Sequence, residues 1–256
     1  MTVVDDYWGG HTVNDTAFGS AAESLAYLAW RSEHYPLFHD LMGLWGDHKG
    51  EVVVDYGCGP GNDMVGFLTY AKAERVIGLD VSEKAIGLAA GRLALHDLTN
   101  RSELIRVSDA KPIIPLESVS VDHINCEGVL QHTSHPAEIL AEFRRILRPR
   151  GTITIMVYNF DSLWTHLVSG PDRDAFRRST DGEDCPISIA YRPEVFEAMC
   201  RTARLPVTFR GGYFNRTELD RWREVTDPCP FVRDLEVIDG YPYHHGLPAG
   251  LGGVYR

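Results

Sequence analysis

The sequence predicts an α/β fold built on a doubly wound, mostly parallel sheet. Short runs of β-branched residues alternate with helical patterns from residue 51 to residue 159, and such alternation is typical of parallel strands joined by crossover helices. The first of these runs leads directly into a loop rich in glycine. With 256 residues, the chain can bury a sizeable core in one large domain or in two small ones.

A helical segment precedes the alternating region. Leucine and alanine recur at helical spacing between residues 17 and 46, and Pro36 divides this stretch into a long helix and a short one. We therefore expect residues 1–48 to form a helical cap or lid, and residues 49–256 to form the main domain.

The alternating region supplies five predicted strands and three predicted helices. The strands are residues 51–57, 75–80, 103–109, 121–126 and 151–159. The helices are residues 62–72, 81–98 and 136–147. Ser82 suits the N-cap of the second helix, because its hydroxyl can accept a hydrogen bond from a free amide of the first turn. Pro136 suits the first turn of the third helix, where no amide partner is needed.

The pattern weakens after Asn159. Residues 160–191 are interpreted as an insertion, with a short helix near residues 163–168 followed by a polar loop. A helix near residues 193–203 and a strand near residues 207–210 resume the alternation. The chain ends in GLGGVYR, which we interpret as a last, antiparallel strand.

Composition and charge disfavour several classes of protein. The formal net charge of −11 disfavours nucleic acid as a partner, because such binding depends on cationic contacts. Arginines do gather between residues 144 and 150, where they suit the C-terminal end of a helix. Five scattered cysteines without a C-x-x-C pair argue against a disulfide framework and a structural zinc site. With no signal-peptide pattern and no long apolar stretch, we expect a cytoplasmic protein that binds no membrane.

The loop after the first strand reads Gly57-Cys58-Gly59-Pro60-Gly61-Asn62. Glycines at such a place let the backbone turn tightly and approach a ligand. A dinucleotide fingerprint would need glycine where this chain has Asn62, and its glycine comes one residue earlier, at Gly61. This departure argues against a nucleotide-dependent dehydrogenase.

Two carboxylates frame the glycine loop. Asp55 precedes Gly57 by two residues, and a negative charge there suits a cationic ligand better than a pyrophosphate. Asp80 ends the second strand, where a carboxylate can accept hydrogen bonds from both hydroxyls of a ribose. Either residue alone would also be compatible with a loop cap or a surface charge.

These stretches resemble the motifs of the class I methyltransferases that use S-adenosylmethionine (SAM). VVVDYGCGPGN resembles their motif I, GLDVS the acidic motif that follows, and SDA at residues 108–110 the loop that meets the adenine amine. VDHINCEGVLQHTSHP resembles the fourth-strand motif, and LRPRGTITIMVYN the fifth. The resemblance covers about residues 50–160 and implies a Rossmann-like fold that binds SAM.

The resemblance also implies a set of cofactor-binding residues, with Asp109 as the partner of the adenine amine. The set is Asp55, Gly57, Gly59, Gly61, Asn62, Asp80, Val81, Asp109, Ala110 and Glu127. Cys58 is expected to pack as a small residue, and Asp109 could alternatively serve only as a turn residue.

The fourth strand is followed by the candidates for catalysis. An alcohol becomes a good nucleophile only when a base takes its proton, and Glu127, Gln131 and His132 are expected at the carboxyl edge of the sheet. We take His132 as the base because the ordinary pKa of histidine lies near neutral pH, with Glu127 as a second catalytic candidate. His132 could instead cap a helix or contact the carboxylate of SAM.

Polar and aromatic residues outside the motifs are candidates for the acceptor and for a metal. We expect Tyr158, Asp184, Tyr191 and His244 to contact the substrate. Asp181, Glu183 and Asp184 are weak candidates for binding Mg²⁺, with solvated loop charge as the alternative. The histidine and tyrosine residues near position 244, and the aromatic residues near position 8, could close the pocket or pack ordinarily.

The predicted function is O-methylation of a small hydroxylated molecule. The N-P-P-Y signature of adenine and glutamine N-methylation is absent after the fourth strand, which reads NCEG. The segment from YNFDSLW to STDGEDCPIS resembles bacterial methyltransferases of sugars or secondary metabolites, including mannose oligosaccharides. A sugar or oligosaccharide is therefore the expected acceptor. One alternative is C- or N-methylation of a small metabolite, and another is a non-catalytic regulatory module that binds SAM. The helices before residue 50 could build a homodimer.

Overall fold

A computed structural model describes residues 2–170 and 185–256 of the chain. Its helices are α1 (Val3–Gly10), α2 (Ala21–His34), α3 (Phe38–Met42), α4 (Asn62–Thr69), α5 (Glu83–Leu95), α6 (Pro136–Ile146), α7 (Pro193–Thr202), α8 (Arg216–Glu224) and α9 (Pro230–Arg233), with the short turns η1 (Thr99–Arg101), η2 (Leu130–His132) and η3 (Trp164–Ser169). Its strands are β1 (Val52–Tyr56), β2 (Arg75–Asp80), β3 (Ser102–Arg106), β4 (Val121–Glu127), β5 (Leu147–Asn159), β6 (Ala190–Tyr191), β7 (Phe209–Tyr213), β8 (Glu236–Ile238), β9 (Tyr241–His244), β10 (Leu247–Pro248) and β11 (Gly252–Tyr255).

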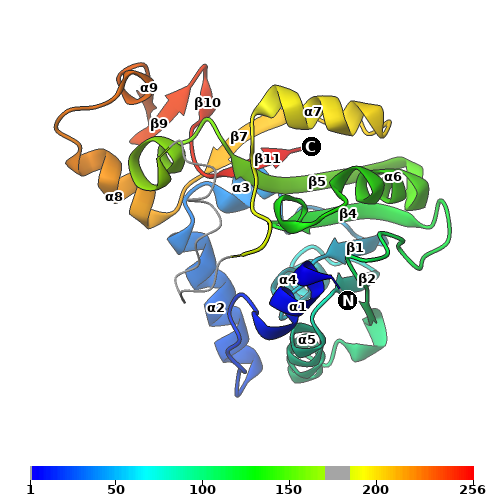
Figure 1. Cartoon of the computed structure of the whole chain (residues 1–256). Coiled ribbons are helices and arrows are strands. Elements are labelled where there is room, and N and C mark those ends of the chain that lie inside the picture. Colours follow the sequence, from blue (N-terminus) through cyan, green and yellow to red (C-terminus); the bar gives the residue numbers. More distant parts are fainter. Residues whose placement is uncertain (1, 171–184) are drawn as a thin grey trace.

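An eight-stranded sheet runs through the molecule in the order β3-β2-β1-β4-β5-β11-β7, with β6 beside β5 (Figure 1). The first five of these strands pair in parallel. The last strand, β11, pairs antiparallel with both β5 and β7. The predicted doubly wound sheet with an antiparallel last strand is therefore confirmed, and its strand order reverses between β1 and β4.

Neighbouring residues of β1 serve two separate cores, because side chains alternate between the faces of a strand. Val54 packs in a cluster with Phe143 of α6 and Phe196 of α7. Val53 packs on the other face, with the buried side chains of α2 to α5 such as Phe67. Helices therefore cover both faces, and the carboxyl edge of the strands lies between them.

Local sequence signals predicted the main elements well. The predicted strand at residues 75–80 is β2 without change, and the helix predicted from Ser82 onward is α5. The Ser82 hydroxyl accepts a hydrogen bond from the amide of Ala85 over 3.2 Å, as expected of an N-cap. The predicted strand at 103–109 ends early, at Arg106, because Ser108 pairs back to Lys111 in a turn.

A small unit near the C-terminus has no counterpart in the predicted elements. Strands β8, β9 and β10 form a separate antiparallel sheet, and Phe214, Leu219, Leu163 and Val232 form the buried part of the cluster beside it. The three strands have at most four residues each, which is too short to show an alternating pattern. The helix α1 is also absent from the predicted elements, and with eight residues that end in two glycines it is too short for a clear helical pattern.

The core around α6 makes a direct prediction about stability. Phe143 is fully buried, so Phe143→Ala should leave a cavity and lower the free energy of unfolding by about 3–5 kcal/mol. Val195 of α7 is 51% exposed, and Val195→Ala should change the free energy of unfolding by less than about 0.5 kcal/mol. Urea titration measures both, and equal losses in the two variants would contradict this account of the core.

Candidate functional site

A cavity of about 550 Å³ opens at the carboxyl edge of the sheet, where the adjacent strands β1 and β4 end. Doubly wound sheets bind ligands at this switch point, and the volume is typical of small-molecule sites. The cavity is lined by the glycine loop, by residues after β4, by the N-terminal helices and by the start of α8. Segments from the whole length of the chain therefore meet around it.

The glycine loop needs its glycines at two positions for different reasons. Gly57 has a φ of 77°, and a Cβ there would lie 2.1 Å from Cγ2 of Val129. Gly59 has a φ of 50°, and nothing lies within 4 Å of the place where its Cβ would be. Gly57 thus allows close packing of the protein, whereas Gly59 leaves backbone open to the cavity.

Asp80 holds the glycine loop in place. Its Oδ2 accepts a hydrogen bond from the amide of Gly59 over 2.9 Å, and its Oδ1 accepts one from the amide of Ser82 over 2.8 Å. Burial raises the pKa of Asp80, and these amides oppose the shift. The amide of Val81 contributes a third hydrogen bond. An ionised carboxylate has about four acceptor sites, so some acceptor capacity remains toward the cavity that Asp80 and Val81 line.

Three carboxylates gather beside the glycine loop around the guanidinium of Arg31. Arg31 pairs with Asp63 over 2.6 Å and also with Glu127. The amide of Asn125 donates to Asp55 over 3.0 Å and to Asp63 over 3.2 Å. Among the described residues, three acidic side chains therefore gather near the guanidinium of Arg31.

Burial and charge separate the pKa values within this cluster. Burial and the neighbouring charge of Asp63 raise the pKa of Asp55 well above its usual value. Burial raises the pKa of Glu127 to about 7, although Arg31 opposes the shift. At Asp63 burial acts in the same direction, but the charge of Arg31 and the hydrogen bonds of Arg31, Glu127 and Asn125 together outweigh it and hold the pKa of Asp63 below its usual value.

Asp109 faces the cavity from the loop after β3. Its Oδ1 accepts from the hydroxyl of Thr133 over 2.6 Å and from the amide of Ser134 over 2.9 Å, and its Oδ2 accepts from the hydroxyl of Thr2 over 3.2 Å. The side chain of Ser134 contributes a further hydrogen bond, so donors from the described residues occupy about all four acceptor sites of this carboxylate. Ala110 is exposed and does not belong to the described lining of the cavity.

His132 lies in the cavity wall as a neutral imidazole with a defined tautomer. Its Nδ1 lies 2.8 Å from the carbonyl oxygen of Ile187, so Nδ1 carries the proton and Nε2 is the acceptor nitrogen. Burial lowers the pKa of His132 to about 4, although the bond to Ile187 opposes the shift. The rings of Trp8 and Tyr158 stand edge-on to the imidazole, at centroid distances of 5.2 and 5.4 Å.

The predicted substrate residues lie in different places. Tyr158 lines the cavity, and burial raises its pKa to about 12. Tyr191 is buried against Phe196, at a centroid distance of 5.2 Å. His244, at the end of β9, packs against the rings of Phe231 and His245 in tilted arrangements, at centroid distances of 4.8 and 4.0 Å. Neither Tyr191 nor His244 is part of the cavity wall that the structure describes.

The proposed magnesium ligands Asp181, Glu183 and Asp184 lie outside the described residues. Within the described ranges no group of three or more His, Cys, Asp or Glu residues could hold a metal ion. No helix in these ranges combines the length and the apolar character needed to span a membrane.

Several residues of the site carry no local signal that sequence reasoning could have used. Arg31, Tyr35 and Tyr213 line the cavity, and the hydroxyl of Tyr213 donates to Oε1 of Glu127 over 3.2 Å. Helical periodicity shows that α2 has a buried face, but not which charges that face will meet. The packing of Trp8 and His11 at the cavity agrees with the aromatic closure considered from the sequence.

Comparison with known proteins decides the family. The family model of a methyltransferase domain matches residues 47–180. The chain belongs to the class I SAM-dependent methyltransferases. The Malonyl-[acyl-carrier protein] O-methyltransferase of Yersinia pestis is 34% identical over 94% of this chain and 79% of that protein.

Other methyltransferases resemble only parts of the chain. A Ubiquinone biosynthesis O-methyltransferase of Aromatoleum aromaticum is 31% identical over 53% of this chain and 59% of that protein. An uncharacterized 37.1 kDa protein of a Streptomyces fradiae transposon is 37% identical over 74% of this chain and 49% of that protein. The chain thus spans about half the length of several curated relatives that it matches.

Solved structures of SAM-dependent methyltransferases share the fold. One from Thermotoga maritima has a TM-score of 0.58 at 16% identity, covering 92% of this chain and 95% of that one. One from Archaeoglobus fulgidus has a TM-score of 0.53 at 14% identity, covering 93% of both chains. At such identities the likeness concerns the fold alone, and the family assignment rests on the sequence matches.

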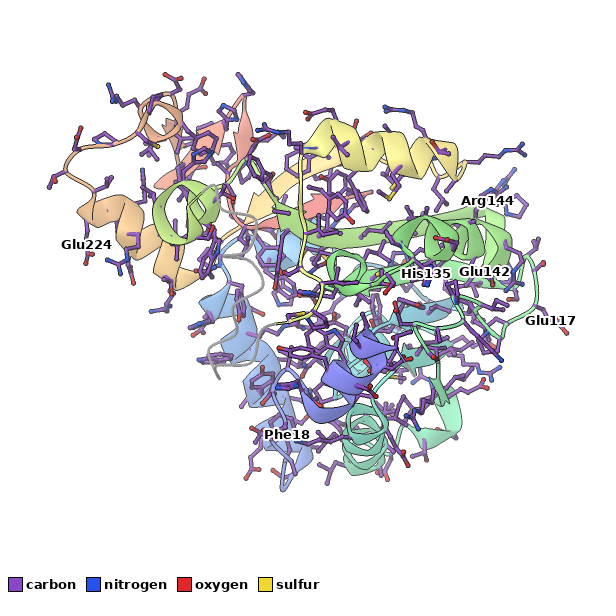
Figure 2. The ribbon with its side chains drawn as sticks, in the orientation of Figure 1. Phe18, Glu117, His135, Glu142, Arg144 and Glu224 are labelled. Carbon is purple, nitrogen blue, oxygen red and sulfur yellow. The ribbon has the colours of Figure 1, made fainter. Side chains whose placement is uncertain are left out.

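The geometry of Asp80 predicts its contribution to SAM binding. Asp80→Ala should raise the dissociation constant of SAM roughly 10- to 100-fold, because it removes a charged hydrogen-bond acceptor from the cavity and releases the amide of Gly59. Glu117 is exposed and points outward on a loop far from the cavity (Figure 2), so Glu117→Ala is the control. Calorimetry measures both variants, and an unchanged affinity in Asp80→Ala would exclude the contact.

Proposed function

We propose that this chain transfers the methyl group of SAM to a hydroxyl group of a small molecule. The observation that carries the proposal is His132, whose neutral imidazole presents Nε2 as an acceptor while Nδ1 is held by the carbonyl of Ile187. It shares one cavity with the glycine loop. Methylation of an alcohol requires a base that removes the hydroxyl proton, whereas methylation of an unprotonated amine does not.

The cofactor end of the cavity fits SAM. Asp80 would accept hydrogen bonds from the ribose hydroxyls, and Asp109, which lines the same cavity, would meet the adenine amine. The carboxyl groups of Asp55, Asp63 and Glu127 suit a cation such as the ammonium group, because a cation beside them would favour their ionised forms. SAM supplies a methyl group that is already activated on a sulfonium, so the protein has mainly to align the reactants and exclude water.

His132 would accept the proton of the acceptor hydroxyl at Nε2. The resulting imidazolium would keep its Nδ1 bond to Ile187, which strengthens as the ring becomes charged. Because burial lowers the pKa of His132 to about 4, the ring would release that proton to water readily before the next turnover. Tyr158 would limit the mobility of the ring from its edge.

The acceptor end is lined by rings and by polar groups. Tyr35, Trp164 and Tyr213 present aromatic surface, and Asn215 and Thr217 present hydrogen-bonding groups. This combination suits a sugar or oligosaccharide, whose rings have apolar faces and polar edges. Two relatives whose names state O-methylation support an oxygen acceptor.

A second candidate is N-methylation of a small amine. The carboxyl groups around Arg31 favour it, because they would attract a cationic acceptor.

The regulatory alternative predicts SAM binding without turnover. The homodimer and the cytoplasmic location stay predictions.

A screen with labelled SAM tests the proposed function. Sugars, oligosaccharides, other hydroxylated metabolites and small amines are incubated with the protein, and methylated products are identified by mass spectrometry. Transfer to a hydroxyl supports the proposal, and transfer only to amines supports the second candidate. SAM binding without any product would contradict both. Running the screen with EDTA and with added Mg²⁺ tests the metal prediction.

The role of His132 predicts a selective loss of turnover. His132→Ala should lower turnover about 100- to 1,000-fold and change the dissociation constant of SAM by less than about twofold. His135 is a partly exposed neighbour (Figure 2), and His135→Ala should keep full activity. Normal turnover in His132→Ala would exclude this base.

The pH dependence follows from the same histidine. Since its folded-state pKa is about 4, the base is already deprotonated at neutral pH, and turnover should be flat between about pH 6 and 8. It should fall only as the pH drops toward the pKa and the ring becomes protonated. A step in rate near pH 7 would instead assign the titrating group to Glu127, whose pKa burial raises to about 7.

A further inference from the structure

Glu218 is a fully buried carboxylate that holds three backbone amides. Its Oε2 accepts from the amide of Trp164 over 3.1 Å. Its Oε1 accepts from the amide of Asn215 over 2.9 Å and from that of Leu251 over 3.2 Å. No Lys, Arg or His of the described ranges forms an ion pair with it. Burial raises the pKa of Glu218 to about 8, and the three amides oppose this shift.

The three amides belong to segments that are distant in sequence and adjacent in space. Trp164 begins η3, 54 residues before Glu218, and Leu251 precedes β11, 33 residues after it. Asn215 is the N-cap of α8 itself. The turn η3 lies against α8 near the small sheet (Figure 1). Trp164, Asn215 and Leu251 all line the cavity, so one carboxylate joins three parts of the same wall.

Helix capping alone does not require this arrangement. Asn215 and Glu218 form a capping box at the start of α8, which needs only the amide of Asn215. At the start of α1 the same box is made with a shorter side chain, because Asp5 accepts from the amide of Thr2 over 3.0 Å. An aspartate thus suffices for the cap, and the longer glutamate reaches two further amides.

We propose that Glu218 is a positioning residue that fixes the wall of the acceptor end and thereby sets how tightly the acceptor binds. The inference rests on the proposed methyl transfer for its meaning, although the wall itself can be measured without turnover. A buried amide left without its hydrogen-bond acceptor is costly. Loss of the carboxylate should therefore let Trp164 and Leu251 move.

Two variants separate this role from capping. Glu218→Gln keeps the shape but places an NH₂ group against one of the amide donors. Glu218→Asp keeps a carboxylate that can cap, as Asp5 does in α1, but withdraws it by about 1.5 Å, the length of one carbon–carbon bond. That distance takes the amides of Trp164 and Leu251 beyond hydrogen-bonding range. Glu224 is exposed at the far end of α8 (Figure 2), and Glu224→Gln is the matched control.

Amide hydrogen exchange of the full chain measures directly how well the amides of Trp164 and Leu251 are protected. Glu218→Asp should exchange about tenfold faster at both Trp164 and Leu251, and Glu218→Gln should do so at whichever of them meets its NH₂ group, with unchanged exchange in β1 and β2. The dissociation constant of SAM should stay within about twofold. For the acceptor with the highest turnover in the screen, KM should rise about tenfold, because small displacements of binding groups are costly, and kcat should change less. Glu224→Gln should match the natural protein throughout.

The outcomes distinguish the inference from its alternatives. If Glu218→Asp shows natural exchange at both amides and a natural KM, Glu218 is only a helix cap and the proposal is overturned. If SAM affinity and exchange in β1 worsen together with KM, the carboxylate serves the fold at large and the proposal is also overturned. If the natural protein methylates nothing, the proposed function fails, while exchange at Trp164 and Leu251 still decides whether Glu218 holds this wall.

Discussion

The guanidinium of Arg31, held between Asp63 and Glu127, is the contact on which the rest of the site depends. It brings α2 from the N-terminal cap onto the carboxyl edge of the sheet, where the adjacent strands β1 and β4 end. Removal of one partner from such a pair would leave buried charge uncompensated, at a cost of about 3–5 kcal/mol. Asp55 receives the amide of Asn125, which it shares with Asp63. The folded chain thereby gathers three carboxyl groups whose ionised forms a cationic cofactor would favour.

At two places in the cavity wall, a carboxyl group that caps a helix also accepts hydrogen bonds from a distant segment. In α1, the capping carboxylate of Asp5 also accepts from the amide of Asp109, over 2.8 Å, and so joins the N-terminal helix to the loop beside the cofactor end. In α8, the capping carboxylate of Glu218 joins Trp164 and Leu251 at the acceptor end. In both helices a residue that stabilises the first turn also holds a cavity wall. Segments near both termini are thereby fixed to the sheet.

Environment divides the tasks of the titratable groups after β4. Burial raises the pKa of Glu127 to about 7 and lowers that of His132 to about 4, because a low-dielectric surrounding disfavours the charged form of either group. Glu127 meets a guanidinium and a phenol, whereas His132 meets a carbonyl and two aromatic edges. Five residues apart in sequence, they are suited to binding a cation and to accepting a proton, respectively.

The sequence by itself determined the sheet, the helix start at Ser82 and the glycine loop, because strand alternation, capping and left-handed glycines are local properties. It also placed Asp55 and Asp80 at the correct edge, since parallel strands end on the same side. It could not place Tyr191 and His244, which pack away from the cavity, or reveal Arg31 and Glu218. Only the tertiary structure decided these partners, the tautomer of His132 and the acceptor wall. Burial and contacts between distant segments create them, and no local pattern records which segments will meet.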